Sequence, residues 1–244
     1  MTTASTLKQR IRDGDVVVSL RIPLTSDRDD VVRALDQGGY DFIYVDGQHT
    51  AFTDDQLVTF CAIADELGLP VQFRIPHTRQ TYLIGRFLDM GLSGILVPEV
   101  VEDATVDEAV GQSYYPQAGR RSWGGTSRLG FDADDPPGRL QYAAWWNEQV
   151  VLGMQLESVV GIARARTLAK PGVDYVAFGP NDLLFSLEGH PHFPLRTVDE
   201  CMTNVAAQLA DTGVRLGMAV ITDSDSDERA KYVDMGITVF QETP

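Results

Sequence analysis

Short apolar segments of strand length alternate with helical segments along almost the whole chain, and this alternation restricts the possible folds most strongly. The segments expected to be strands are 16–20, 41–47, 71–76, 94–100, 150–156, 174–181, 214–221 and 237–242. They are apolar almost throughout, which is typical of parallel strands that are buried on both faces. Eight such strands predict a (β/α)8 TIM barrel over residues 1–244 as a single domain, because barrels of this type run to about 250 residues.

A doubly wound parallel sheet is the alternative arrangement of the same elements. It is disfavoured, because no G-x-G-x-x-G dinucleotide-binding turn follows the first strand. Ser26 and Thr53 are expected to cap two of the helices, since their side chains suit that position. The alternation is interrupted at 113–139, a segment rich in turn residues that is expected to be a long loop with an effect on specificity.

The formal net charge of −15 disfavours nucleic acid and anionic membranes as partners. No run of about 18 apolar residues predicts a membrane span, and no charged-then-apolar leader predicts secretion. Cys61 and Cys201 fall inside helical patterns, so they are expected to be core thiols rather than a disulfide or a zinc site. The expected location is the cytoplasm.

Polar residues recur where the strands end, and TIM-barrel enzymes carry their active sites at that rim. They include Asp46, Gln48, His49, Arg74, Glu99, Gln155, Glu157, Asn181 and Asp182. His49 is either a surface residue or, beside Asp46, a general base, since histidine titrates near neutral pH. Arg74 is either part of a structural ion pair or a two-point clamp for a substrate carboxylate.

Glu157 and Asp182 each follow a strand, and either one alone could cap the next helix. Together, with Gln155 on the same face as Glu157, they predict a metal site instead. Two carboxylates and several waters suit Mg²⁺ or Mn²⁺, with coordination positions left for a chelating substrate.

Seven motifs, taken in order, resemble those of the HpcH/HpaI family of class II pyruvate aldolases, the group that includes 4-hydroxy-2-oxoheptanedioate aldolase. These motifs are VDGQH, QFRIP, FLDMG, ILVPEV, YYPQAGRRSWG, QLES and FGPNDL. The resemblance covers nearly the whole chain, and QLES with FGPNDL at this spacing is the most specific pair.

The resemblance implies a TIM barrel of the phosphoenolpyruvate/pyruvate-domain type with a divalent metal, Mg²⁺ or Mn²⁺ first and Co²⁺ or Zn²⁺ as alternatives. It places the metal on Glu157 and Asp182, with Gln155 nearby, and the pyruvate carboxylate and carbonyl on Arg74. His49 becomes the acid/base, with Asp46 and Asp89 orienting it or groups of a neighbouring subunit. The pyruvate pocket is lined by Gly179, Pro180 and Asn181.

Three features depart from the family pattern. Gln48 stands where the family usually has Glu, and Leu184 stands where it usually has Ser. The sequence stops at Pro244, so the family's last helix, often exchanged between subunits, is expected to be absent or truncated. A homo-oligomer is still expected, but not necessarily the usual hexamer.

The predicted function is a metal-dependent lyase that cleaves or forms 4-hydroxy-2-oxo acids from pyruvate, or a related 2-oxo acid, and an aldehyde. A bound metal and Arg74 would stabilise the enolate charge, so no Schiff-base lysine is needed. One alternative is a citrate-lyase-like acyl-CoA lyase, for which Arg120, Arg121 and Arg128 offer the only basic patch. The other is a non-catalytic barrel that binds a 2-oxo acid.

Overall fold

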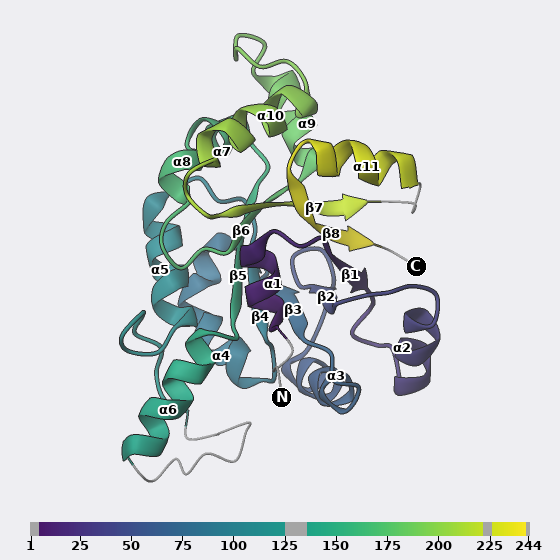
Figure 1. The fold of residues 1–244 in the computed structure, drawn as a ribbon, viewed down its shortest axis with the longest axis vertical. Coiled ribbons are helices and arrows are strands. Elements are labelled where there is room, and N and C mark those ends of the chain that lie inside the picture. Colours follow the sequence, from purple (N-terminus) through teal and green to yellow (C-terminus); the bar gives the residue numbers. More distant parts are fainter. Residues whose placement is uncertain (1–4, 125–135, 222–225, 243–244) are drawn as a thin grey trace.

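The computed structural model describes residues 5–124, 136–221 and 226–242, in which eight parallel strands form a closed barrel (Figure 1). The strands are β1 Val17–Arg21, β2 Phe42–Asp46, β3 Val71–Arg74, β4 Gly94–Val97, β5 Val151–Leu156, β6 Tyr175–Phe178, β7 Arg215–Ile221 and β8 Ile237–Glu242. Each strand pairs with the next in sequence, and β8 pairs with β1 to close the ring. The predicted TIM barrel is confirmed, and an open doubly wound sheet is excluded.

Helices alternate with the strands, and most of them lie around the outside of the barrel (Figure 1). They are α1 Leu7–Asp13, α2 Arg28–Leu35, α3 Asp54–Glu66, the 3₁₀ helix η1 Thr78–Leu83, α4 Ile84–Asp89, α5 Asp103–Ser113, α6 Pro136–Asn147, α7 Val159–Ala163, α8 Ala165–Leu168, α9 Pro180–Gly189, α10 Val198–Leu209 and α11 Ser226–Asp234. In the described ranges, none of these helices has the length and apolar character needed to cross a bilayer.

Side chains that accept backbone hydrogen bonds determine where the helices begin. Thr53 accepts from the Gln56 amide and begins α3, as the sequence predicts. Ser26 is not the cap of α2, because Asp27 takes that position. The Asp27 carboxylate accepts from the Asp30 amide and the Asp30 carboxylate accepts from the Asp27 amide, which satisfies two otherwise unpaired donors.

Two segments differ from the sequence prediction. The turn expected after β6 is the start of helix α9, which has Pro180 in its first turn, where a missing N–H costs no hydrogen bond. The expected loop at 113–139 is interrupted by α6, which already begins at Pro136. Residues 125–135 of that segment lie outside the described part of the chain.

The interior of the barrel and the layer between strands and helices form two apolar clusters. The cluster inside the ring contains Ile11, Val17, Phe42, Tyr44, Leu96, Val151, Tyr175, Ala177 and Val239. The larger cluster packs the outward faces of the strands against the helices. Cys61 and Cys201 are buried in the core, as predicted, and neither forms a disulfide among the described residues.

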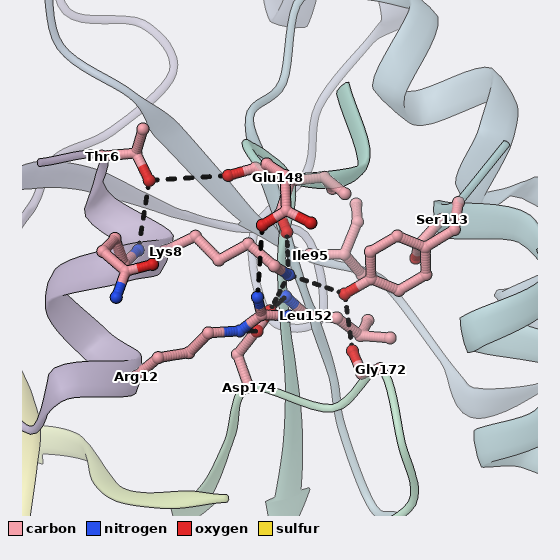
Figure 2. A network of polar contacts seen from close by, with 12 residues as sticks. Thr6, Lys8, Arg12, Ile95, Ser113, Glu148, Leu152, Gly172 and Asp174 are labelled. Carbon is pink, nitrogen blue, oxygen red and sulfur yellow. Dashed lines mark hydrogen bonds and ion pairs between the residues drawn. The ribbon is translucent and has the colours of Figure 1, made fainter. Parts of the chain in front are cut away.

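Helix α1 covers the end of the barrel at which the strands begin, and it is held there by a buried lysine (Figure 2). Lys8 Nζ donates to Asp174 Oδ2 at 2.7 Å, to the Val150 carbonyl at 2.7 Å and to the Tyr114 hydroxyl at 2.8 Å. Val150 and Asp174 directly precede β5 and β6. Burial lowers the pKa of Lys8, although the charge of Asp174 opposes that effect.

Candidate active site

At the opposite end of the barrel, the last residues of β2 and β3 form a buried ion pair. The parallel register sets Asp46 beside Arg74. Arg74 Nε donates to Asp46 Oδ1 at 2.8 Å and Arg74 Nη2 donates to Asp46 Oδ2 at 2.6 Å. Burial alone would raise the pKa of Asp46, but the hydrogen bonds and charge of Arg74 outweigh it, so this pKa lies below its ordinary value. Asp46 is therefore an anion that fixes the arginine.

Two further groups complete the surroundings of Asp46. Arg21, at the end of β1, donates from Nη2 to Asp46 Oδ2 at 3.3 Å. The Gln48 backbone amide donates to Asp46 Oδ1 at 3.0 Å. A small pocket beside this carboxylate is lined by Arg21, Pro23 and Thr50 among others. Both oxygens of Asp46 therefore accept hydrogen bonds, from the guanidinium groups of Arg21 and Arg74 and from the backbone of the turn that follows β2.

Gln155 on β5 connects this ion pair to the predicted metal-binding carboxylate. Arg74 Nη1 donates to Gln155 Oε1 at 3.3 Å, and Gln155 Nε2 donates to Glu157 Oε2 at 2.7 Å. A continuous hydrogen-bonded series thus runs across the barrel from Asp46 to Glu157. It uses three of the five N–H donors of the Arg74 guanidinium, so the arginine retains donors for a further anion.

Glu157 is a buried carboxylate at the end of β5, with 6% of its surface exposed. Its Oε1 accepts from the Glu99 backbone amide at 2.7 Å. Burial raises the pKa of Glu157 to about 7, and the negative charge of Asp182 adds to the increase, whereas the Glu99 amide and Arg74 oppose it. A carboxylate in these surroundings gains from a cation that would neutralise it.

Gly179 follows β6, and because it has no side chain, Glu157 and Gln155 can pack directly against its backbone. A Cβ atom added at Gly179 would lie 2.4 Å from Glu157 Oε2 and 2.7 Å from Gln155 Nε2. Gly179 is also the N-cap of α9, so the same residue sets the position of Asp182 in the first turn of that helix. Glycine at this position therefore lets Glu157 lie close to the start of α9, the helix that carries Asp182 in its first turn.

The carboxylate oxygens of Glu157 and Asp182 suit a hard divalent cation, but these two residues would be few ligands for one ion. Among the described residues, no group of three or more His, Cys, Asp or Glu side chains could enclose a metal ion. Two carboxylates with waters and a chelating substrate are nonetheless the usual surroundings of Mg²⁺. Gln155 would lie beside the ion rather than bind it, because its Oε1 already accepts from Arg74.

The other predicted site residues lie at differing distances from this centre. Pro180 and Asn181 precede Asp182 at the start of α9, with Asn181 exposed. His49 is exposed in the turn that follows β2, and no hydrogen bond within the described chain joins it to Asp46. Its role as acid/base remains a prediction.

Asp89 is not brought to the rim of its own barrel. It is the last residue of α4, which returns towards the beginning of β4, and its Oδ1 accepts from Arg121 Nη2 at 2.6 Å. The Arg121 guanidinium in turn lies over the Tyr115 and Trp146 rings. Any contribution of Asp89 to a site therefore requires a neighbouring subunit.

Two polar residues at the rim were not predicted. Arg21 ends β1 and His77 follows β3, so the same strand-end rule that selected Arg74 would have found them. Glu99, which follows β4, is one of the strand-end residues that the sequence identifies. The backbone of Glu99 is also unusual. Its φ of 52° lies in the left-handed region, where residues other than glycine are strained.

A closed parallel barrel with a paired arginine, a buried acid and a second acid at its C-terminal rim is the arrangement of a TIM-barrel enzyme. Residues 22–239 match the family model described as HpcH/HpaI aldolase/citrate lyase, so the chain belongs to that family. It is therefore an enzyme of the lyase class, as predicted, and its relatives are named aldolases.

The similarity to individual relatives extends over most of each chain. The hydroxypyruvate/pyruvate aldolase of Paraburkholderia phytofirmans is 26% identical over 225 residues, covering 89% of this chain and 84% of the relative. The 2-keto-3-deoxy-L-rhamnonate aldolase of Salmonella gallinarum is 29% identical over 208 residues, covering 82% and 74%. The crystal structure of an HpcH/HpaI aldolase from Desulfitobacterium hafniense matches with a TM-score of 0.82 and 27% identity, over 99% of this chain and 91% of that one.

Proposed function

We propose that this enzyme is a divalent-metal-dependent aldolase that joins pyruvate, or a related 2-oxo acid, to an aldehyde and cleaves the resulting 4-hydroxy-2-oxo acid. The observation that carries the proposal is the hydrogen-bonded series from Arg74 through Gln155 to Glu157. It joins a guanidinium group to a buried carboxylate, and this supports a site in which the arginine binds the carboxylate of a 2-oxo acid and Glu157 binds an ion that the same acid chelates.

Each residue has a distinct part in the cleavage direction. Arg74 binds the 2-oxo acid carboxylate, and Asp46 keeps the guanidinium oriented. Glu157 and Asp182 would hold the ion, which supplies Lewis-acid stabilisation of the developing enolate charge when it is bound. His49 would accept the proton of the C4 hydroxyl while the C3–C4 bond breaks and its electron pair moves towards the 2-oxo group. Return of a proton to C3 then gives pyruvate, and the hydroxyl-bearing fragment leaves as the aldehyde.

The proposal is tested by exchange of the pyruvate methyl protons in deuterated water, followed by NMR with Mg²⁺ or Mn²⁺ added and with a chelator. Exchange that depends on the metal and is lost in both Glu157→Gln and Asp182→Asn is expected. Exchange that survives the chelator unchanged would contradict the metal assignment. Pyruvate binding without exchange under any divalent metal would support the non-catalytic barrel instead.

The acyl-CoA lyase alternative has little support from the charges near the expected loop. Arg120 pairs with Glu108, and Arg121 pairs with Asp89, so both cations are already matched by carboxylates. Arg128 lies outside the described residues. A CoA phosphate would have to displace these partners.

We also expect the enzyme to act as a homo-oligomer. Asp89 lies at the far end of α4 from the site of its own barrel, so only another copy of the chain could bring this residue to a catalytic rim. Light scattering coupled to size exclusion would measure the assembly. Mixing an Arg74→Lys chain with an Asp89→Asn chain should restore exchange if subunits share sites, whereas no restoration would contradict shared sites.

A further inference from the structure

Three side chains from three different strand ends form a polar group beside the candidate site, and we call Gln48, His77 and Glu99 the rim cluster. Gln48 Nε2 donates to Glu99 Oε1 at 3.3 Å. His77 Nε2 lies 4.0 Å from Glu99 Oε2. The side chains of His77 and Glu99 are 51% and 52% exposed, so both can meet a ligand that enters from solvent.

Backbone contacts attach the rim cluster to both halves of the site. The Gln48 amide donates to Asp46 Oδ1 at 3.0 Å, and the Glu99 amide donates to Glu157 Oε1 at 2.7 Å. The left-handed conformation of Glu99 turns its amide towards Glu157 while its side chain meets Gln48. Two members of the cluster are thus bonded through their backbone amides to Asp46 and Glu157, which border the place where the 2-oxo acid would be held.

The hydrogen bonds of His77 determine which ring nitrogen carries the proton. His77 Nδ1 accepts from the Arg79 backbone amide at 3.0 Å and so caps η1. Since Nδ1 is an acceptor, the ring proton of neutral histidine resides on Nε2, which faces Glu99. The pair therefore offers one N–H donor and one carboxylate acceptor side by side.

Gln48 contacts Glu99 through its side-chain amide. Its Nε2 holds Glu99 Oε1, while its Oε1 is buried without a hydrogen-bond partner among the described residues. A carboxylate at position 48 would repel Glu99, whereas the amide donates to it. Gln48 therefore positions Glu99 through Oε1 and leaves Glu99 Oε2 for His77 or a ligand.

We propose that the rim cluster selects an uncharged aldehyde that carries a hydroxyl group. This inference rests on the proposed aldolase function and names the class of its second substrate. A hydroxyl both accepts and donates, so one oxygen about 2.8 Å from His77 Nε2 and from Glu99 Oε2 satisfies both groups at once. A methyl group can do neither, and a carboxylate is repelled by Glu99. His77 and Glu99 are thus specificity-determining residues for the aldehyde.

A set of two-carbon aldehydes tests this selection, because acetaldehyde, glycolaldehyde and glyoxylate differ only in a methyl, a hydroxymethyl or a carboxylate. With pyruvate and Mn²⁺, we expect kcat/KM for glycolaldehyde to exceed that for acetaldehyde by about tenfold, the effect of one hydrogen bond to a charged group. Glyoxylate should be the poorest of the three. The difference should lie in the KM for the aldehyde.

Two variants separate the contributions of the pair. Glu99→Gln keeps the size of the side chain but removes its charge, so glycolaldehyde preference should fall several-fold and glyoxylate should improve. His77→Asn retains an acceptor that can cap η1 but loses Nε2, so glycolaldehyde preference should fall without a gain for glyoxylate. Glu102→Gln, an exposed residue of the same loop, is the matched control and should change no ratio.

Exchange of the pyruvate methyl protons and the Mn²⁺ affinity are measured on every variant. Both should remain within about twofold of wild type in His77→Asn and in Glu102→Gln, since neither substitution removes a group that binds pyruvate or the ion. Glu99→Gln removes a charge that acts on Glu157, so its aldehyde ratios are compared at saturating Mn²⁺. Intact exchange with unaltered aldehyde ratios would overturn the inference and leave the aldolase function standing. A parallel loss with all three aldehydes would show a structural role and also overturn it. Absence of exchange in the wild type with either metal would overturn both proposals.

Discussion

The guanidinium of Arg74 and the carboxylate of Asp46 form a buried ion pair with two parallel hydrogen bonds, Nε to Oδ1 at 2.8 Å and Nη2 to Oδ2 at 2.6 Å. The two interpretations left open by the sequence are therefore compatible. One edge of the guanidinium forms the structural ion pair, and Nη1 extends towards Gln155 and the site. The ion pair with Asp46 therefore fixes the orientation of the Arg74 guanidinium towards the site.

Replacing Arg74 with lysine should therefore abolish most activity while retaining the positive charge. An ammonium group cannot contact Asp46 at two points and reach Gln155 and a substrate carboxylate in a fixed plane. We expect kcat/KM for pyruvate exchange to fall by about 100-fold, the usual effect of losing one oriented donor. Arg33→Lys, at an exposed pair with Asp30, should leave the rate unchanged. Equal rates for Arg74→Lys and wild type would show that charge alone suffices.

Gly179→Ala should disrupt the metal-binding half of the site without unfolding the barrel. Its Cβ would lie 2.4 Å from Glu157 Oε2, so the carboxylate has to move. We expect Mn²⁺ affinity, measured by calorimetry, to fall at least about tenfold, in the range that displaced metal-site contacts produce. Gly189→Ala lies on the same helix, where an added Cβ meets nothing within 4 Å, and should bind Mn²⁺ like the wild type.

The raised pKa of Glu157 predicts a specific pH dependence of stability in the metal-free protein. Its value of about 7 lies above the ordinary 4.5, so the folded state binds this proton more tightly than the unfolded state. The contribution to the free energy of unfolding is therefore full below pH 4.5 and is lost as the pH rises to about 7. Relative to Glu157→Gln, we expect a loss of up to about 3 kcal/mol over that interval by urea unfolding.

Added Mn²⁺ should reverse this trend, because only the ionised carboxylate binds the ion and metal affinity rises with pH. The Glu157→Gln protein should show neither the loss of stability nor the pH-dependent gain from Mn²⁺. A wild-type minus variant difference that stays flat with pH would contradict the assignment of the raised pKa to Glu157.

Lys8→Met should destabilise the fold but leave the chemistry of each folded molecule intact. The substitution leaves Asp174 buried with one partly exposed cation, Arg12, and the Leu152 amide. Removing one partner of a buried ion pair lowers the free energy of unfolding by about 3–5 kcal/mol. Urea unfolding at pH 7 would measure this loss. The double variant Lys8→Met with Asp174→Asn should recover part of this loss. A fall in exchange rate per folded molecule would show that the two ends of the barrel are coupled.

The strands could be predicted because burial on both faces leaves an unmistakable pattern, and their ends then located most of the site. Arg74, Gln155 and Glu157 are joined by hydrogen bonds because parallel register brings strand ends to one rim. Asp89 could not be placed in this way. Its helix runs opposite to the strands, so a position next to β4 in sequence lies at the other end of the barrel.

Other features depend on contacts that sequence spacing does not determine. The left-handed Glu99 donates its backbone amide to Glu157, and no residue pattern indicates this, since the sequence at that point would suit an ordinary strand end. Similarly, Asp27 displaces Ser26 as the cap of α2, because two acids three residues apart can satisfy each other's amides. Both outcomes depend on local geometry rather than on composition.

The buried lysine of α1 has a consequence for the order in which this protein folds. Lys8 and Asp174 are 166 residues apart, and a lysine ammonium loses its hydration favourably only when its counter-charge is already in place. Asp174 acquires its position when β5 and β6 pair, since its side chain accepts from the Leu152 amide. The first helix of the sequence therefore docks among the last. Contacts of such long range also slow folding, so the hydrogen-exchange protection of the α1 backbone amides would report completion of the barrel.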